Sequence, residues 1–244
     1  LSMWEAAEAG NLSSLIYHIR NHYQQGGNDK KLKELLNARN PSTEYTLLHT
    51  VFSEQNRNKN IHPILKLLLE HGADVSTPNV YNIYPIHAVC MHYPDPYVYL
   101  ELLLNFKAKL NVRDGDGWTP LHYAARFSVP PGPPMKLLIE RGANINSTCG
   151  SHKTPLFSLI ANGDYPKTLD WLIHTARADL TIRGECLFNL PPAPKTQVGT
   201  VLLQVVKFGR IECLSLLLHS PVAMAQLCRA VDENELQYAQ HIAR

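Results

Sequence analysis

The stretch GWTPLHYAAR, residues 117–126, places a histidine between a Thr-Pro-Leu triplet and a pair of alanines. Histidine is the side chain most often used for proton transfer near neutral pH, so His122 could serve an active site or hold the fold together. A catalytic residue is needed once per site, whereas a scaffold residue recurs with the scaffold. The rest of the chain therefore decides between the two interpretations.

The same four-residue phrase occurs four times, and its last position recurs after 38, 35 and 35 residues. A second phrase follows each copy, and its central alanine recurs every 35 residues, at 73, 108, 143 and 178. Two interleaved phrases in one register indicate an internal repeat. The four copies of the first phrase are TLLH (46–49), YPIH (84–87), TPLH (119–122) and TPLF (154–157).

Helical signals lie at fixed places within each repeat. Two apolar columns, beginning at Leu67-Leu68 and repeated 35, 70 and 105 residues later, are typical of a helix buried against its neighbours. Gly72 and Gly142 follow these helices, where a left-handed cap favours glycine. Thr46, Thr119 and Thr154 are predicted to cap the first helix of each repeat, with Pro120 and Pro155 at its first position.

With these phrases, the repeat resembles the ankyrin repeat, a helix–turn–helix unit with a hairpin loop, a T-P-L-H-x-A mark and a period of about 33 residues. The resemblance implies an all-α fold: an ankyrin-repeat solenoid of about six helix pairs with hairpin-loop fingers. It implies a single domain over residues 1–244. Near the end of this domain, Asn234 and Gln237 have the spacing of a helix capping box. The expected units are approximately 1–41, 42–79, 80–114, 115–149, 150–184 and 185–221, followed by C-terminal capping helices at 222–244.

Two departures from the period stand out. An insert at 21–31 lengthens the first unit. A longer surplus falls where the family carries a finger, and its central part, 187–194, contains three prolines. Because proline cannot donate to a strand ladder, we expect an extended loop there.

The repeat favours a structural role for the histidines, because His49, His87 and His122 occupy one position in successive units. The resemblance implies that this position supplies hydrogen bonds between neighbouring units. The chain contains no phosphate-binding loop, no H-E-x-x-H and no G-x-S-x-G. A nucleophile at Cys90 or Cys213 is the alternative, although Cys90 falls on a small, packed position of the repeat. We therefore expect no enzymatic activity, no catalytic residues, no metal and no cofactor.

Composition narrows the class further. Lys and Arg number 23 and Asp and Glu 21, a net charge of +2, which disfavours a nucleic-acid partner. Five scattered cysteines without a C-x-x-C pair indicate free thiols and an intracellular location, in the cytoplasm or the nucleus. No apolar run is long enough for membrane insertion. The chain begins with Leu1 rather than Met, which predicts a fragment of a longer protein or a cloning remnant.

The resemblance implies a concave groove made by the first helix of each repeat and bordered by the fingers. Its exposed positions in the repeats that begin at 84 and 119 are rich in aromatic, Arg and Met side chains, the types enriched at binding hot spots. Packing of Trp118 and Tyr123 against neighbouring fingers is the alternative explanation. The predicted partner-binding residues are Tyr81, Met91, His92, Trp118, Tyr123, Arg126 and Phe127.

These observations predict a non-enzymatic module that binds a protein or peptide partner in its concave groove, with no small-molecule substrate. One alternative is a substrate-targeting or adaptor domain of a larger enzyme, such as a secreted effector or a ubiquitin-ligase subunit. Another is a methyl-lysine reader in which Tyr81, Trp118 and Tyr123 form an aromatic cage.

Overall fold

The computed structural model describes residues 1–188 and 195–242 and forms two compact units. The first unit comprises Leu1–Gly115 and Phe127–Pro130. The second comprises the described part of Asp116–Arg126 and Pro131–Arg244. The sequence predicts one domain with six repeats and a C-terminal cap, and those boundaries remain a prediction.

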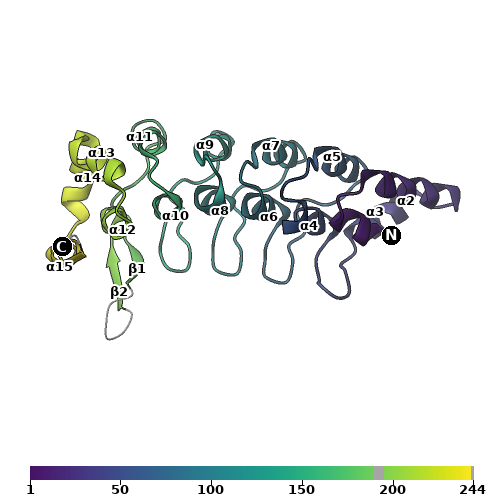
Figure 1. The fold of residues 1–244 in the computed structure, drawn as a ribbon, viewed down its shortest axis with the longest axis horizontal. Helices are drawn as coiled ribbons and strands as arrows, with labels where there is room; N and C mark the ends of the chain where they lie inside the picture. The colour runs from purple at the N-terminus through teal and green to yellow at the C-terminus, as the bar shows by residue number, and fades with distance from the viewer. Residues whose placement is uncertain (189–194, 243–244) are drawn as a thin grey trace. The chain divides into compact units, whose positions relative to one another are not determined.

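Helices pack in two rows in the first unit. α4 and α6 lie side by side in one row, and α2, α5 and α7 succeed one another in the other (Figure 1). Each inner helix contacts the outer helix that follows it, α4 with α5 and α6 with α7, as the repeat predicts. The elements are α1 (Met3–Glu8), α2 (Leu12–Gln24), α3 (Asp29–Asn37), α4 (Leu47–Val51), a 3-10 turn (Glu54–Asn56), α5 (His62–Glu70), α6 (Pro85–His92) and α7 (Tyr97–Asn105).

The insert at 21–31 is mostly helical. Its first four residues continue α2 to Gln24, and its last three begin α3 at Asp29. The Asn28 side chain accepts a hydrogen bond from the Lys31 backbone N–H at 3.0 Å and so caps α3. The extra residues therefore lengthen one helix and start another.

In the second unit the helices again form two rows, and a hairpin interrupts them. α10 packs on α12 in the inner row and α11 on α13 in the outer row. The elements are α8 (Pro120–Phe127, with Phe127 itself in the first unit), α9 (Gly132–Glu140), α10 (Pro155–Asn162), α11 (Pro166–His174), β1 (Gly184–Phe188), β2 (Lys195–Gly199), α12 (Val201–Lys207), α13 (Ile211–His219), α14 (Pro221–Ala230) and α15 (Glu233–Ile242).

The hairpin corrects two predictions, a wholly helical fold and a loop over 187–194. β1 and β2 pair antiparallel, from Gly184 opposite Gly199 to Phe188 opposite Lys195. Side chains alternate along β1: Cys186 and Phe188 are buried, and Leu187 is exposed. Prolines do not prevent this pairing because they fall between the strands in the sequence. Residues 189–194 of the predicted loop lie outside the described residues.

The helix ends confirm the prediction for the two glycines and correct the capping prediction for Thr46 and Thr154. Gly72 and Gly142 have φ of 93° and 103°, the left-handed conformation expected after these helices. Thr46 and Thr154 precede their helices, but their hydroxyls make no capping bond to the backbone. The Thr46 hydroxyl instead bonds to the ring of a histidine three residues later, His49.

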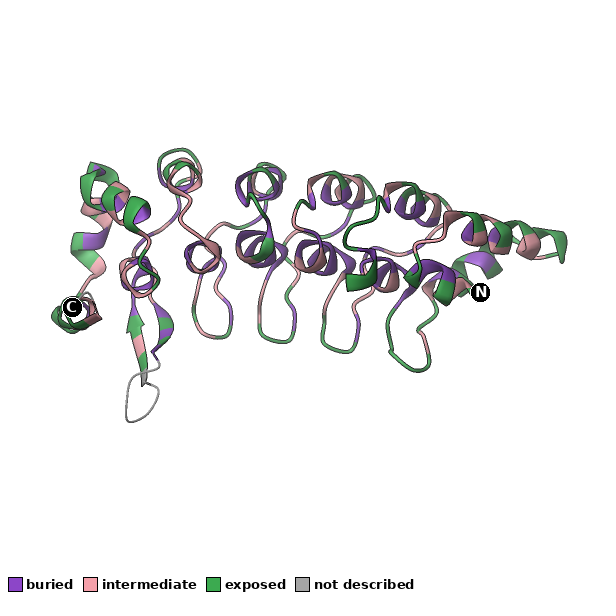
Figure 2. Ribbon diagram, in the orientation of Figure 1, coloured by how far each residue is buried: buried purple, intermediate pink, exposed green. Residues whose placement is uncertain are grey.

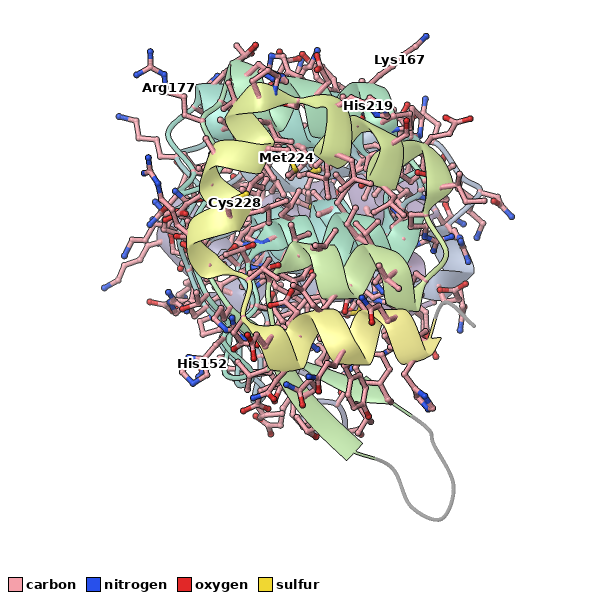
Figure 3. The ribbon with its side chains drawn as sticks, turned by 90° about the vertical axis from the view of Figure 1, so that its left-hand side faces the viewer. His152, Lys167, Arg177, His219, Met224 and Cys228 are labelled. Carbon is pink, nitrogen blue, oxygen red and sulfur yellow. The ribbon has the colours of Figure 1, made fainter. Side chains whose placement is uncertain are left out.

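The last two helices close the C-terminal end of the second unit. α14 contacts α11 and α13, and α15 lies against α12 and β2, as Figure 3 shows from that end. α15 begins at Glu233, so the predicted capping box at Asn234 and Gln237 is wrong. Asp232 caps the helix instead, accepting from the Glu235 backbone N–H at 2.8 Å.

The buried residues concentrate where the two helix rows face each other within each unit, and the fingers are mostly exposed or half-buried (Figure 2). In the second apolar column Leu68 is buried in the first unit and Ile173 in the second, as predicted. In the first column Leu172 is buried, whereas Leu67 is half-buried. Among the described helices none is by itself long and apolar enough to cross a bilayer; α13 and α14 reach that length only as a pair, bent by 92° at their junction.

Candidate functional site

Three histidines occupy the same position of successive repeats, and all are buried. A carbonyl oxygen can only accept, so each ring donates through Nε2 to a backbone carbonyl further along the chain. These bonds join one repeat to the finger that follows, which confirms the structural interpretation of the histidine phrase. The donor–acceptor distances are 2.7 Å for His49 and Ile83, 3.3 Å for His87 and Val112, and 3.0 Å for His122 and Lys153.

The other ring nitrogen is also occupied. His122 Nδ1 accepts from the Thr119 backbone N–H at 3.1 Å and from its hydroxyl at 2.8 Å. Burial lowers the pKa of His49 to about 4, which keeps that ring neutral at pH 7. A neutral ring with both nitrogens bonded to the scaffold supplies structure rather than proton transfer.

The environments of Cys90 and Cys213 disfavour the alternative that either thiol is a nucleophile. Burial raises the pKa of the Cys90 thiol far above its usual range and that of Cys213 to about 12. A nucleophilic cysteine needs a lowered pKa and an accessible thiolate. Within residues 1–188 and 195–242, no group of three or more His, Cys, Asp or Glu side chains is arranged to hold a metal ion.

Four of the predicted partner-binding residues lie in the first unit. Tyr81, at a finger tip, is 68% exposed, and Phe127 is 41% exposed. Met91 and His92 are half-buried at the end of α6. His92 Nδ1 lies 3.5 Å from the Glu54 carboxylate, so this histidine contacts the 3-10 turn that follows α4 as well as solvent.

The other three lie in the second unit, and they are not equally accessible. Trp118 and Arg126 are half-buried, whereas Tyr123 is only 7% exposed. The Tyr123 ring meets the Trp118 indole edge-on, with 5.4 Å between the ring centres. Tyr123 therefore supports Trp118 by packing, and its burial disfavours it as the wall of a methyl-lysine cage.

The predicted partner-binding residues leave out two lysines of the same unit, Lys153 and Lys207. Lys207, at the end of α12, lies over the rings of Phe188 and Phe208, 5.2 and 5.0 Å from their centres, and donates to the Leu187 carbonyl. Lys153 belongs to the finger in front of α10. The signal was available, because Lys153, Lys207 and Phe208 occupy the same repeat positions as Trp118, Arg126 and Phe127.

Comparisons with known proteins agree with this architecture. A family model described as ankyrin repeats (3 copies) matches residues 56–148 and 86–184, which together exceed half of the chain. In two variola virus sequences, the ankyrin repeat protein OPG189 is 28% identical to this chain over 123 residues, 48% of the chain and 21% of the relative. The match thus spans about a fifth of the length of these curated relatives. With the repeat phrases, the paired helices and the histidine bonds, the family match shows that the chain belongs to the ankyrin-repeat family.

Proposed function

We propose that this chain is a non-enzymatic module that holds a protein or peptide partner against the inner helices of its repeats. Ankyrin repeats are generally protein–protein interaction modules. The proposed location is the cytoplasm or the nucleus, where the five cysteines, all of them free thiols, stay reduced.

One observation carries the proposal. The histidine rings are hydrogen-bonded within the fold, whereas bulky side chains near them in the repeat are accessible to solvent. Both ring nitrogens of His122 are bonded within the fold. Four residues further along the same helix Arg126 is half-buried, and Phe127 next to it is 41% exposed. Aromatic and Arg side chains at such positions are the types that dominate binding energy at protein interfaces.

Affinity capture followed by mass spectrometry would identify a partner, and calorimetry with purified variants then tests the surface. Trp118→Ala, Arg126→Ala and Phe127→Ala should each weaken binding about tenfold or more without unfolding the chain. Ser158→Ala is a matched control, because Ser158 lies at an equivalent inner position but is buried. Unchanged affinity in all three variants would rule out this surface.

A catalytic function is tested separately. Wild-type protein should show no turnover in panels of hydrolase and transferase substrates. Dose-dependent turnover that His122→Ala abolishes would overturn the proposal.

A further inference from the structure

The inner surfaces of the two units differ in charge. In the first unit the corresponding positions, on α4, on the 3-10 turn after it and on α6, carry one fully charged side chain, Glu54, which pairs with Arg57 at 3.0 Å. In the second unit they carry Arg126 on α8, Lys153 in the next finger and Lys207 on α12, and no carboxylate. We call the two lysines, Lys153 and Lys207, the basic cluster.

Two hydrogen bonds to its carbonyl oxygen fix the backbone of Lys153. Its carbonyl accepts from the His122 ring at 3.0 Å and from the Cys149 backbone N–H at 3.0 Å. Its side chain runs along β1 at Gly184, where a Cβ would stand only 2.8 Å from the Lys153 Cγ. The glycine thus leaves room for the lysine stem, and the fold determines the direction that this stem takes.

Lys207 approaches the same strand from the helix side. Its ammonium donates to the Leu187 carbonyl and lies over the Phe188 ring. The Cys186 thiol on β1 is buried and donates to the Gln204 side chain at 3.1 Å. Burial raises its pKa, and the nearby charges of Lys153 and Lys207 both oppose that rise. Burial lowers the pKa of Lys207, and the nearby charge of Lys153 acts in the same direction.

Acidic groups of the fold do not neutralise this pair. Throughout the described part of the chain, no carboxylate oxygen lies within 4.0 Å of either lysine ammonium. Glu185 alternates with Cys186 along β1 and points to the opposite, exposed side of the strand. Glu235 is fully buried and bonded to Thr200. Among the described residues, these two neighbouring, half-buried lysines therefore have no carboxylate partner.

From this arrangement we infer that the basic cluster binds an acidic segment of the protein partner, with an Asp or Glu carboxylate between Lys153 and Lys207. This inference rests on the proposed function and adds the chemistry of the partner. A carboxylate there would accept charge-assisted hydrogen bonds from both ammonium groups. Phe208, 37% exposed beside Lys207, offers an apolar contact to the neighbouring residue of the segment.

Selection from a phage library of random 12-residue peptides tests the inference, because it needs no known partner. Wild-type protein and the double variant Lys153→Gln/Lys207→Gln are used as baits in parallel. Lys136→Gln/Lys167→Gln is the matched control: it removes the same charge from the outer helices α9 and α11, where Lys136 covers the Trp171 ring and Lys167 projects outward (Figure 3). Peptides selected by wild type and by the control should be enriched in Asp and Glu, and those selected by the double variant should not.

Fluorescence anisotropy with one wild-type-selected peptide gives the affinities. Lys153→Gln should weaken binding about fivefold, Lys153→Arg should restore it, and added salt should weaken the wild type more than Lys153→Gln. If the baits select peptides without acidic enrichment, or if all variants bind equally, the inference is wrong while the proposed function stands. If wild type selects no peptides above background, both are overturned.

Discussion

The ring of His122 lies 3.0 Å from the Lys153 carbonyl and joins the repeat that begins at Thr119 to the finger of the next one. The same carbonyl belongs to a residue whose side chain contributes to the basic cluster. One hydrogen bond therefore links the scaffold to the surface that we propose for binding, and substitutions at the two ends of this bond should have different consequences.

His122→Ala should lower the free energy of unfolding by about 1–3 kcal/mol, because the buried Thr119 hydroxyl loses its bond to the ring and the Lys153 carbonyl keeps only its bond from the Cys149 backbone N–H. Urea unfolding followed by circular dichroism measures the loss. His241→Ala is the control, since His241 is exposed near the end of α15. Equal midpoints for the two variants would contradict the structural role.

Stability should also depend on the protonation of His49. Burial lowers the pKa of His49 from 6.5 to about 4, so the unfolded chain takes up a proton before the folded one as the pH falls. Its contribution to stability is complete above pH 6.5 and is lost as the pH falls from 6.5 to 4. The expected loss is about 3 kcal/mol.

Urea unfolding at pH 7, 5.5 and 4 measures this dependence, with His49→Gln as the comparison. Glutamine retains a donor but does not titrate, so the variant should lose less stability over this range. If wild type and variant have parallel pH profiles, His49 is not the group responsible.

The repeated elements of this fold can be predicted from the sequence because the same pattern of residues recurs in successive repeats. The leucine columns, the glycines at 72 and 142 and the bonding of His122 all follow from the register of the phrases. The same register also includes Lys153 and Lys207 among the inner positions. Their proximity could not be predicted, because it depends on β1, which both lysine side chains contact.

The non-repeated parts were harder to predict for physical reasons. Prolines in the surplus segment obscured the strands on either side of them. At the C-terminal end, Arg183 and Glu235 are 52 positions apart in the sequence, yet Arg183 Nη1 and Glu235 Oε2 lie 3.4 Å apart. A long-range pair of this kind occurs once, so no repeated sequence pattern predicts it.

Lys107→Gly should stabilise the chain. Lys107 has φ of 66° at the position that Gly72 and Gly142 occupy in other repeats, and glycine adopts this conformation without steric cost. The expected gain is about 1 kcal/mol, measured by thermal unfolding. Lys109→Gly is the control, because Lys109 is also exposed but is not among the residues with positive φ, so glycine there should only destabilise. A loss of stability in both variants would show that φ at 107 carries no strain.

Phe188→Ala should destabilise the chain by about 3 kcal/mol, although the residue lies beside a proline-rich segment. Phe188 is 4% exposed, and its ring centre lies 5.0 Å from that of Tyr238 on α15. Its neighbour Leu187, 51% exposed on the other face of β1, provides the control. Leu187→Ala should change the free energy of unfolding by less than about 0.5 kcal/mol. Thermal unfolding with no difference between the two would show that the hairpin does not pack against α15.

The attachment of α15 should depend on Glu235, the fully buried carboxylate of this helix. Glu235 Oε1 accepts from the Thr200 backbone N–H at 2.9 Å and from its hydroxyl at 2.6 Å, and Oε2 lies 3.4 Å from Arg183. Glu235→Ala leaves the fully buried Thr200 N–H and hydroxyl without this acceptor and removes a charge that faces Arg183, so it should cost about 2–3 kcal/mol. Hydrogen exchange read by mass spectrometry should show that, in Glu235→Ala, the amides of α15 lose protection before those of α10.

Two control variants test this assignment. Glu235→Gln can still accept from Thr200 but loses the charge that faces Arg183, so the protection of its α15 amides should fall between that of wild type and that of Glu235→Ala. Glu233→Ala, exposed at the start of the same helix, should leave exchange unchanged. If Glu235→Ala and Glu233→Ala exchange alike, then α15 is held by its apolar contacts, such as Tyr238 on Phe188, and the buried carboxylate contributes little to its attachment.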